Sequence, residues 1–260
     1  MWRKLRVLIL LFILATVAHR AWLESHDLEW KDSLYVAVYP VNADGSDQAR
    51  TYIQQLSADQ LLGITDYFAE QAARYELNLA YPFQLRLGPA VDDQPPQPPQ
   101  SVQNANMLKI ALWSLHLRWW SWRHSPPVSI PPDVKIYLLY HDPQQYRVLP
   151  HSTALSKGRV GLVNLYADEL YAKQNAVIIA HELLHTVGAT DKYDLASSLP
   201  YFPDGYAEPE KDPTYPQDYA ELMAGRVPVS QNKAEIPRGL AYTLIGKRTV
   251  AEIGWLRGGK

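Results

Sequence analysis

A His-Glu-Leu-Leu-His sequence at residues 181–185 constrains this chain more than any other feature. On a helix, His181 and His185 lie one turn apart on the same face, so their imidazoles can bind one metal ion. Glu182 is then placed to take a proton from a water molecule at that metal. The mainly apolar residues 175–180 before the motif and Gly188 after it predict a buried helix that ends near residue 188. The alternative is a helix that carries two histidines for packing or solvation.

The residues after the motif indicate a third metal ligand. Gly188 can adopt a positive φ angle and turn the chain sharply, which would bring a side chain three residues later back toward the metal. That residue is Asp191. A carboxylate oxygen binds zinc at about 2.0–2.2 Å, close to the distance for an imidazole nitrogen. Asp191 is therefore a plausible zinc ligand beside the two histidines.

Residues 181–191 read H-E-L-L-H-T-V-G-A-T-D, which resembles the metzincin metallopeptidase signature H-E-x-x-H-x-x-G-x-x-H. Asp191 stands where most members carry a third histidine, and this variant is similar to the snapalysin-type pattern H-E-x-x-H-x-x-G-x-x-D. A second family feature is Met223, within the sequence A-E-L-M-A-G, because metzincins place a methionine in a tight turn beneath the metal. The resemblance covers these two segments and does not extend to the rest of the chain.

The resemblance implies an α+β, zincin/metzincin-like fold. We expect a twisted mixed sheet with backing helices above a zinc-bearing helix, followed by a small, loop-rich C-terminal subdomain with the Met-turn and a terminal helix. In this scheme, residues 26–260 form a single catalytic domain. Its upper subdomain covers about 32–188 and its lower subdomain about 189–260.

The resemblance also implies a site for Zn²⁺ and a reaction. His181, His185 and Asp191 would bind the ion, and Glu182 would act as the general base in the hydrolysis of peptide bonds. Met223 would form an apolar floor under the imidazoles rather than bind the metal. The expected partner is a peptide or protein substrate.

Further polar residues lie between the zinc signature and the Met-turn. Tyr193 and Tyr206 are candidates to bind substrate or to donate a hydrogen bond to an oxyanion, although a tyrosine is more often structural. Some zincins take their third ligand from a more distant segment, and three glutamates are rivals to Asp191 on that basis. The Gly188 spacing and Met223 favour Asp191 over these rivals, which are Glu208, Glu210 and Glu221.

Composition supports one large domain. Hydrophobic residues make up 47% of the 260 residues, enough for a substantial core. The formal net charge of −2 indicates no global attraction to nucleic acid, so we expect no such partner. With no cysteine, histidines and carboxylates are the available metal ligands. The sequence does not indicate an oligomeric state.

The N-terminus resembles an export signal. Arg3, Lys4 and Arg6 precede the apolar residues 7–18, which predicts a signal or membrane anchor within residues 1–25. We favour a retained anchor over cleavage after Ala18. Both place the remainder outside the cytosol, anchored or secreted, because the positive charges stay inside. The alternative is a buried N-terminal helix of a cytosolic protein.

Hydrophobic patterns predict the elements before the zinc helix. Strands are expected at 34–41, 83–87, 134–140 and 159–166, and helices from Ser57 or Asp59 to Leu79 and from 102 to 123. The 159–166 strand is expected at the sheet edge, where it could pair with an extended substrate. One face of the first helix collects Leu61, Ile64, Phe68, Ala72, Tyr75 and Leu79.

The 102–123 helix and the C-terminal helix carry further predictions. In the 102–123 helix, Trp113, Leu117 and Trp120 share a face that suits packing on a sheet. Trp119 and Trp122 are surplus to that face, and such residues could instead contact a membrane interface or single-stranded nucleic acid. Near the C-terminus, Thr249 is expected to cap a closing helix with Val250, Ile253 and Leu256 on one face.

Together these features favour an exported or membrane-anchored zinc metallopeptidase. The alternative is a catalytically inactive zincin-fold protein that binds a partner or supports the cell envelope. Glu182 argues against the inactive form, since a protein without catalysis has no need of a base.

Overall fold

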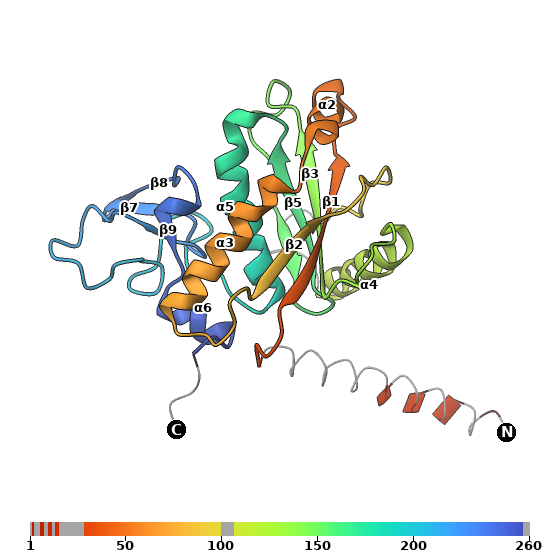
Figure 1. Ribbon diagram of the computed structural model, residues 1–260, viewed down its shortest axis with the longest axis horizontal. Helices are drawn as coiled ribbons and strands as arrows, with labels where there is room; N and C mark the ends of the chain where they lie inside the picture. Colours follow the sequence, from red (N-terminus) through yellow and green to blue (C-terminus); the bar gives the residue numbers. More distant parts are fainter. Residues whose placement is uncertain are drawn as a thin grey trace.

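The computed structural model describes residues 29–99 and 107–256, together with the helical positions 2, 6, 7, 10, 11, 14 and 15 (Figure 1). The predicted signal or anchor within residues 1–25 therefore lies mostly outside the described residues. Across the described part of the chain, no helix is both long enough and apolar enough to cross a membrane.

A five-stranded mixed sheet forms the centre of the molecule, in the order β2-β1-β3-β5-β4. The first four strands pair in parallel, and β4 pairs antiparallel with β5. The inner strands are apolar on both faces, as is typical of a parallel sheet that is covered on both sides. The four predicted strands are confirmed. The bounds are β1 Leu34–Asn42, β2 Phe83–Leu87, β3 Val134–His141, β4 Thr153–Leu155 and β5 Val160–Tyr166.

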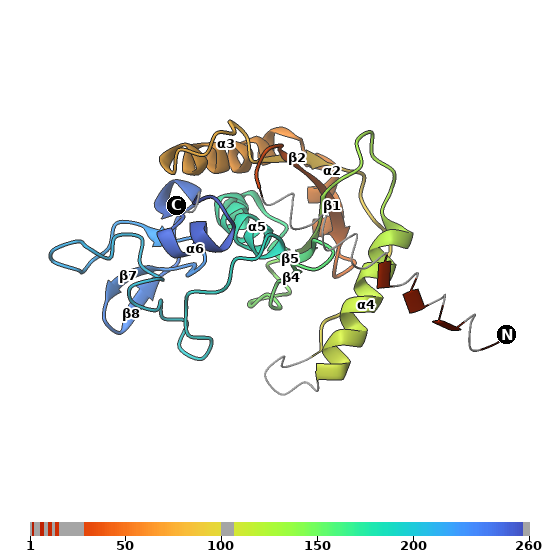
Figure 2. The same ribbon diagram turned by 90° about the horizontal axis from the view of Figure 1, so that it is seen from below.

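Helices cover both faces of this sheet (Figures 1 and 2). The helices α2 (Asp47–Gln55), α3 (Asp59–Arg74) and α5 (Ala172–Thr186) share the larger core with one face, which includes Val36 and Val38. The helix α4 (Met107–His124) shares a second core with the alternate residues of the same strands. Because strand side chains alternate between faces, each strand contributes to both cores.

The prediction for the sheet edge was wrong. The strand β5 does not lie at the edge, because β4 pairs along its outer side with Ala154 opposite Gly161. At three residues, β4 is too short to give a clear periodic pattern, so the sequence did not reveal it. The strand available at this edge of the sheet is therefore β4.

The helix predictions are confirmed with changed bounds. Leu61, Ile64, Phe68 and Ala72 are buried on α3 as expected, but the helix ends at Arg74 instead of Leu79. The chain leaves the helix at Glu76, where φ is positive. The structure adds α2, whose N-cap Ser46 accepts a hydrogen bond from the Ala49 amide. The predicted start of α4 at residue 102 lies outside the described residues.

Residues 189–256 contain little regular structure. They contribute short pairs of strands, one 3₁₀ turn and the helix α6 (Lys247–Glu252). Thr249 lies inside α6 and does not cap it, and Leu256 is exposed, so these two predictions were wrong. Val250 and Ile253 are buried as predicted. The strands are β6 Ala220–Glu221, β7 Val227–Ser230, β8 Lys233–Glu235 and β9 Thr243–Leu244. Among the described residues, the 3₁₀ turns are η1 Glu169–Tyr171 and η2 Leu240–Tyr242.

The C-terminal part packs on α5 and α3, on the same side of the sheet. Leu222, Met223, Val250 and Ile253 join the larger core. Trp30, just before β1, donates a hydrogen bond to the Ile253 carbonyl at 2.6 Å and so ties the two ends of the described fold together. This packing brings residues that are far apart in sequence against the histidine face of α5.

Candidate metal centre

The helix α5 presents the two histidines of the motif side by side. The rings of His181 and His185 have centroids 4.7 Å apart, and their Nε2 atoms are 3.1 Å apart. The preceding residues of α5 anchor the helix, because Val177, Ile179 and Ala180 are buried in the larger core. The face of α5 that carries the two imidazoles is thus held in place by apolar packing.

Backbone carbonyls fix the orientation of both rings. The Nδ1 atom of His181 lies 2.9 Å from the Leu222 carbonyl oxygen, and Nδ1 of His185 lies 2.8 Å from the Ala189 carbonyl oxygen. Since a carbonyl only accepts, each Nδ1 must donate, and each neutral ring then has a lone pair on Nε2. Two lone pairs directed at each other repel unless a cation lies between them. This second contact on Nδ1 is typical of metal-binding histidines.

Asp191 completes a converging set of three groups. Its Oδ1 atom lies 3.1 Å from Nε2 of His181 and 3.2 Å from Nε2 of His185. Gly188 makes this possible with φ +102°, at the end of a helix whose last carbonyls accept from residues 187–189. The predicted turn is therefore present, and it delivers both Asp191 and the Ala189 carbonyl to the centre.

The three groups fit a zinc ion. Ligands in a tetrahedral zinc site, at about 2.0–2.1 Å from the metal, lie roughly 3.3 Å from one another. The separations of 3.1–3.2 Å among the two Nε2 atoms and Oδ1 are close to that value. Two imidazoles and a carboxylate are also the donor types that zinc prefers. The site can thus hold Zn²⁺ after only small adjustments.

The electrostatics of the centre favour a positive charge between these groups. Burial of His181 would lower its pKa, but the hydrogen-bonded Asp191 carboxylate, the charge of Glu182 and the Leu222 carbonyl raise the pKa to about 9. Burial would raise the pKa of Asp191, whereas the two imidazoles hold it well below its usual range. A carboxylate that stays ionised beside two basic nitrogens is suited to binding a cation.

Glu182 lies beside the histidines without pairing with them. One of its carboxylate oxygens lies within 4.8 Å of a nitrogen of each imidazole, whereas the Oδ1 atom of Asp191 is 3.1 and 3.2 Å from the two Nε2 atoms. Its Oε2 atom is buried and has no hydrogen-bond partner among the described residues. Burial raises the pKa of Glu182, against the opposing charges of His181 and His185. The carboxylate is therefore more basic than an exposed one and has an acceptor position open.

A tight turn at residues 221–225 lies next to His181 and helps to orient its ring. The amides of Ala224 and Gly225 donate to the Glu221 carbonyl, and Gly225 has φ +66°. Met223 is fully buried in the core beside α5, and the Leu222 carbonyl accepts from His181. The residue predicted to form an apolar floor is therefore buried directly next to the residue that orients one imidazole.

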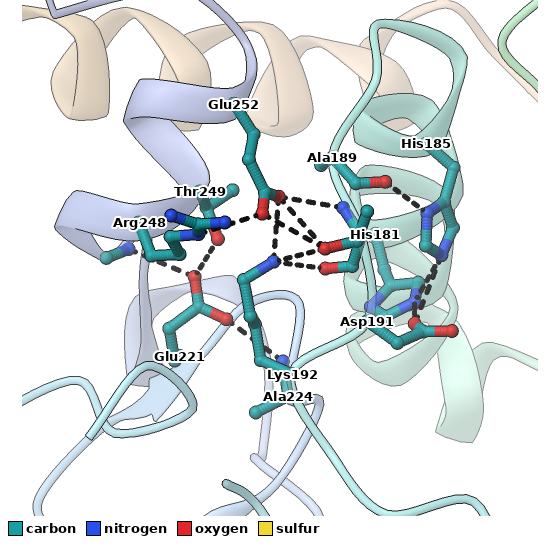
Figure 3. Close-up of polar contacts among 12 residues, drawn as sticks. His181, His185, Ala189, Asp191, Lys192, Glu221, Ala224, Arg248, Thr249 and Glu252 are labelled. Carbon is teal, nitrogen blue, oxygen red and sulfur yellow. Dashed lines mark hydrogen bonds and ion pairs between the residues drawn. The ribbon is translucent and has the colours of Figure 1, made fainter. Parts of the chain in front are cut away.

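A polar network connects the Asp191 loop to α6 (Figure 3). Lys192, which is buried, donates from Nζ to Glu252 at 2.7 Å and to the Thr190 carbonyl at 2.6 Å. Glu252 also accepts from the Thr190 amide at 2.9 Å and from Arg248 at 3.2 Å. These contacts hold the residues on both sides of Asp191.

The two predicted tyrosines differ in their surroundings. The ring of Tyr193 lies 6.5 Å from the His181 ring, and burial, with the charges of Asp191 and Glu182, raises its pKa to about 12. It is thus a protonated donor beside the centre. Tyr206 instead shares a 2.7 Å hydrogen bond with Tyr215. Within the described residues, the structure connects Tyr206 to that partner and not to the metal centre.

The three rival ligands have other partners. Glu208 accepts from the Asp218 amide at 2.9 Å, and Glu210 lies 4.0 Å from Lys247. Glu221 is fully buried and accepts from Thr249, at 2.7 Å, and from two backbone amides. The structure therefore brings Asp191, and none of these glutamates, into contact with the histidines.

Sequence reasoning missed the residues that hold the site together. Glu252 lies sixty residues after Lys192, and no local pattern relates the two. The sequence suggests Glu221 only as a rival ligand, whereas in the structure its carboxylate accepts from the Gly246 amide and from Thr249 at the start of α6. Since a lone buried pair leaves no periodic signal, only the folded chain reveals these contacts.

Comparisons with known proteins add little to this geometry. Neither a protein-family model nor a curated protein matches the chain. Among solved structures, it is similar to a zinc-dependent peptidase from Methanocorpusculum labreanum (strain Z), with 12% identity and a TM-score of 0.31. That match covers 84% of this chain and 99% of the other.

Proposed function

We propose that this protein is a zinc-dependent peptidase of the metzincin type. The observation that carries the proposal is the convergence of His181, His185 and Asp191 around one point, with the unpaired carboxylate oxygen of Glu182 beside it. A helix that carried its histidines only for packing would not need both Nδ1 atoms fixed and both Nε2 atoms directed at one carboxylate.

The arrangement supports catalysis rather than a purely structural metal. Structural zinc sites are closed by four protein ligands, whereas catalytic sites keep a position open. Three groups converge closely here, and the Asp191 side chain is 36% exposed, so the centre reaches solvent. A fourth position can then hold water or substrate.

The chain's own residues provide the remaining chemistry. A bound zinc ion would supply positive charge that polarises the water and the scissile carbonyl. Glu182 accepts the proton of the attacking water at its open carboxylate oxygen and passes it to the leaving amine. The hydroxyl of Tyr193, which stays protonated, is available to donate to the developing oxyanion. The buried core around Glu182 keeps its carboxylate basic.

Two further features favour the metzincin type. Gly188 turns the chain so that Asp191 follows the helix directly, and Met223 lies buried in a tight turn next to α5. The free edge of β4 is the place where an extended peptide could add as a strand. Export, with the protein anchored or secreted, remains a proposal that is supported by the cationic and apolar pattern of residues 1–25.

The function is tested with the full chain in detergent and a diverse peptide library. The wild type should copurify with about one zinc per chain and cleave peptides, and a chelator should stop cleavage. Glu182→Gln should keep the metal and the melting temperature but lose hydrolysis by several orders of magnitude, because the base is absent.

Three other outcomes would contradict parts of this proposal. A metal-free wild type that takes up no zinc on titration would contradict the metal centre itself. Full zinc without any cleavage across the library would favour the inactive binding or structural protein of the envelope. Cleavage that survives in Glu182→Gln would exclude this glutamate as the base.

A further inference from the structure

The helix α4 has two apolar faces. Its inner face packs on the sheet through Trp113, Leu117 and Trp120, as the sequence predicted. On the opposite side, four large apolar residues follow one another at steps of three and four. These are Leu112, Leu115, Trp119 and Trp122, with exposed fractions of 57, 56, 55 and 74%. We call this set the outer stripe.

The outer stripe lies directly opposite the residue that anchors the helix. At 100° per residue, its four members fall within a narrow sector centred on the side away from Leu117. Leu108 is also exposed and lies one turn before Leu112 on the same side. Exposed apolar residues scattered singly need no explanation, but a continuous stripe of this kind marks an interaction surface.

Basic side chains border the outer stripe on both sides. Lys109, His116 and Arg123 follow one another at steps of seven, so they form a line along one side of it, and all three are exposed. Arg118 lies on the other side, half-buried, with its Nε donating to the Ser114 carbonyl. Residues 107–124 contain no aspartate or glutamate.

Among the described residues, the acidic side chain that contacts α4 lies on the side of the helix that faces the sheet. Asp93 lies 3.8 Å from His124, whose ring stacks on Trp120, a residue of the inner face. The outer stripe itself therefore combines apolar residues with positive flanks only. That combination is complementary to an anionic, partly apolar surface.

We propose that the outer stripe of α4 docks on a membrane surface that contains anionic lipids. The leucines enter the boundary of the acyl chains, and the indoles of Trp119 and Trp122 lie at the headgroup level, where tryptophan is enriched. Lys109, Arg123 and Arg118 contact the lipid phosphates. This surface is separate from the metal centre, since α4 and α5 cover opposite faces of the sheet (Figure 2).

Other occupants fit the surface less well. A second copy that met the outer stripe with its own would place the cationic flanks against each other. Single-stranded nucleic acid stacks on aromatic rings, but Leu112 and Leu115 offer no such platform. A lipid surface accepts leucines, tryptophans and cations in one contact.

The natural absence of cysteine allows a site-specific test with the full chain. A nitroxide label on Leu115→Cys is compared with one on Glu70→Cys, an exposed position on α3 on the other side of the sheet. The protein is reconstituted in vesicles of phosphatidylcholine with and without phosphatidylglycerol. With anionic lipid, the label at 115 should become several-fold less accessible to an aqueous nickel complex and more accessible to oxygen, whereas the label at 70 should not change.

A charge variant tests the flanks. Lys109→Gln with Arg123→Gln should reduce the equilibrium constant for docking by roughly fivefold per lost cation, because each contributes about 1 kcal/mol to binding at an anionic surface. The matched control, Lys247→Gln, removes a cation in the C-terminal part whose side chain is 85% exposed, and it should leave docking unchanged. Both variants keep the inner face of α4 and the metal centre intact.

Three results would overturn the proposal. Equal aqueous accessibility at positions 115 and 70 on anionic vesicles would show that α4 stays in water. Shielding of position 115 without vesicles, increasing with protein concentration, would assign the stripe to a second copy. Shielding by an oligonucleotide but not by vesicles would assign it to nucleic acid. The activity with peptides is independent of all three results.

Discussion

The sheet part, residues 34–186, and the C-terminal part, residues 189–256, are stabilised in different ways. In the sheet part, apolar residues repeat with the period of a strand or a helix and pack into two cores. In the C-terminal part, buried polar side chains such as Lys192 and Glu221 fix short, irregular segments by hydrogen bonds. The candidate metal centre takes its histidines from the first and Asp191 from the second.

The two histidines and the third group of the site are therefore held in different ways. The sheet part supplies most of the apolar core that holds α5, and with it His181 and His185. The third group and the carbonyl that orients His181 depend on loops whose positions are set by a few polar contacts. A destabilising substitution in the sheet part should therefore leave the zinc affinity of the folded protein unchanged. A destabilising substitution in the C-terminal part should also weaken zinc binding.

The largest effect on stability is expected in the sheet part. Phe68 is fully buried, with its ring 4.7 Å from that of Phe83. Phe68→Ala should lower the free energy of unfolding by about 3–5 kcal/mol through lost burial and a cavity. Chemical denaturation measures this change. The zinc affinity of the molecules that remain folded should stay as in the wild type, and Leu62→Ala, an exposed position on the same helix, should have little effect.

The next effect concerns the buried ion pair of the C-terminal part. Lys192→Met removes the buried partner of the half-buried Glu252, which keeps Arg248, and should cost about 2–3 kcal/mol. Unlike Phe68→Ala, it should also weaken zinc binding, because the loop around Asp191 loses its support. Lys233→Met, which breaks an exposed pair, is the control and should cost about 0–1 kcal/mol. Unchanged zinc affinity in Lys192→Met would break the distinction between the two parts.

The same ion pair gives a pH dependence with a defined sign. Burial of Glu252 would raise its pKa, but its contacts with Lys192 and Thr190 lower it below the ordinary value of 4.5. A lowered pKa stabilises the fold at pH values above the ordinary one, and this contribution is lost as the pH falls through the lowered value. Denaturation curves of Glu252→Gln should therefore depend less on pH in this acidic range than those of the wild type.

A smaller effect is expected at the turn that joins the two parts. Gly188→Ala places a Cβ on a residue with φ +102° and should cost about 1–2 kcal/mol. The strain should also displace Asp191 and weaken zinc binding. Gly63→Ala is the matched control: this glycine lies within α3, a Cβ there meets no neighbour within 4 Å, and the change should be neutral or slightly stabilising. Equal effects at the two glycines would contradict the role of the turn.

The smallest effect is expected at the cap of α2. Ser46→Ala removes the side chain that accepts from the Ala49 amide and should cost about 1 kcal/mol. Thermal or chemical denaturation measures it. Zinc affinity should not change, since α2 belongs to the sheet part and lies outside the metal centre. A loss of zinc binding here would show that the two parts are not separable.

The sequence predicts much of the sheet part because burial leaves a periodic signal. The four longer strands, the helix α5 and the buried face of α3 all follow from apolar spacing. The edge strand β4 was missed because three half-buried residues have no readable period. The helix α2 is short and polar, with only Ala49 and Tyr52 buried, so its pattern was equally weak.

The candidate site was predictable where its spacing is local. His181, Glu182 and His185 lie within one helical turn and a half, and Gly188 with Asp191 completes a continuous segment. The orienting carbonyls of Leu222 and Ala189 carry no side-chain signal at all. Contacts of this kind depend on how the loop folds back on α5, which spacing alone does not determine.

The most direct test of the account is to identify the third zinc ligand on the full chain. X-ray absorption of the zinc-loaded protein should show two imidazole nitrogens and a carboxylate oxygen at about 2.0–2.2 Å, with a light atom in the remaining position. Asp191→Ala should lose the carboxylate and weaken zinc binding by more than the 10–100-fold typical of groups that only orient ligands. Glu208→Ala should leave both the spectrum and the affinity as in the wild type. An unchanged spectrum in Asp191→Ala, with zinc lost instead on changing Glu208 or Glu221, would contradict a centre built jointly by α5 and the loop that follows it.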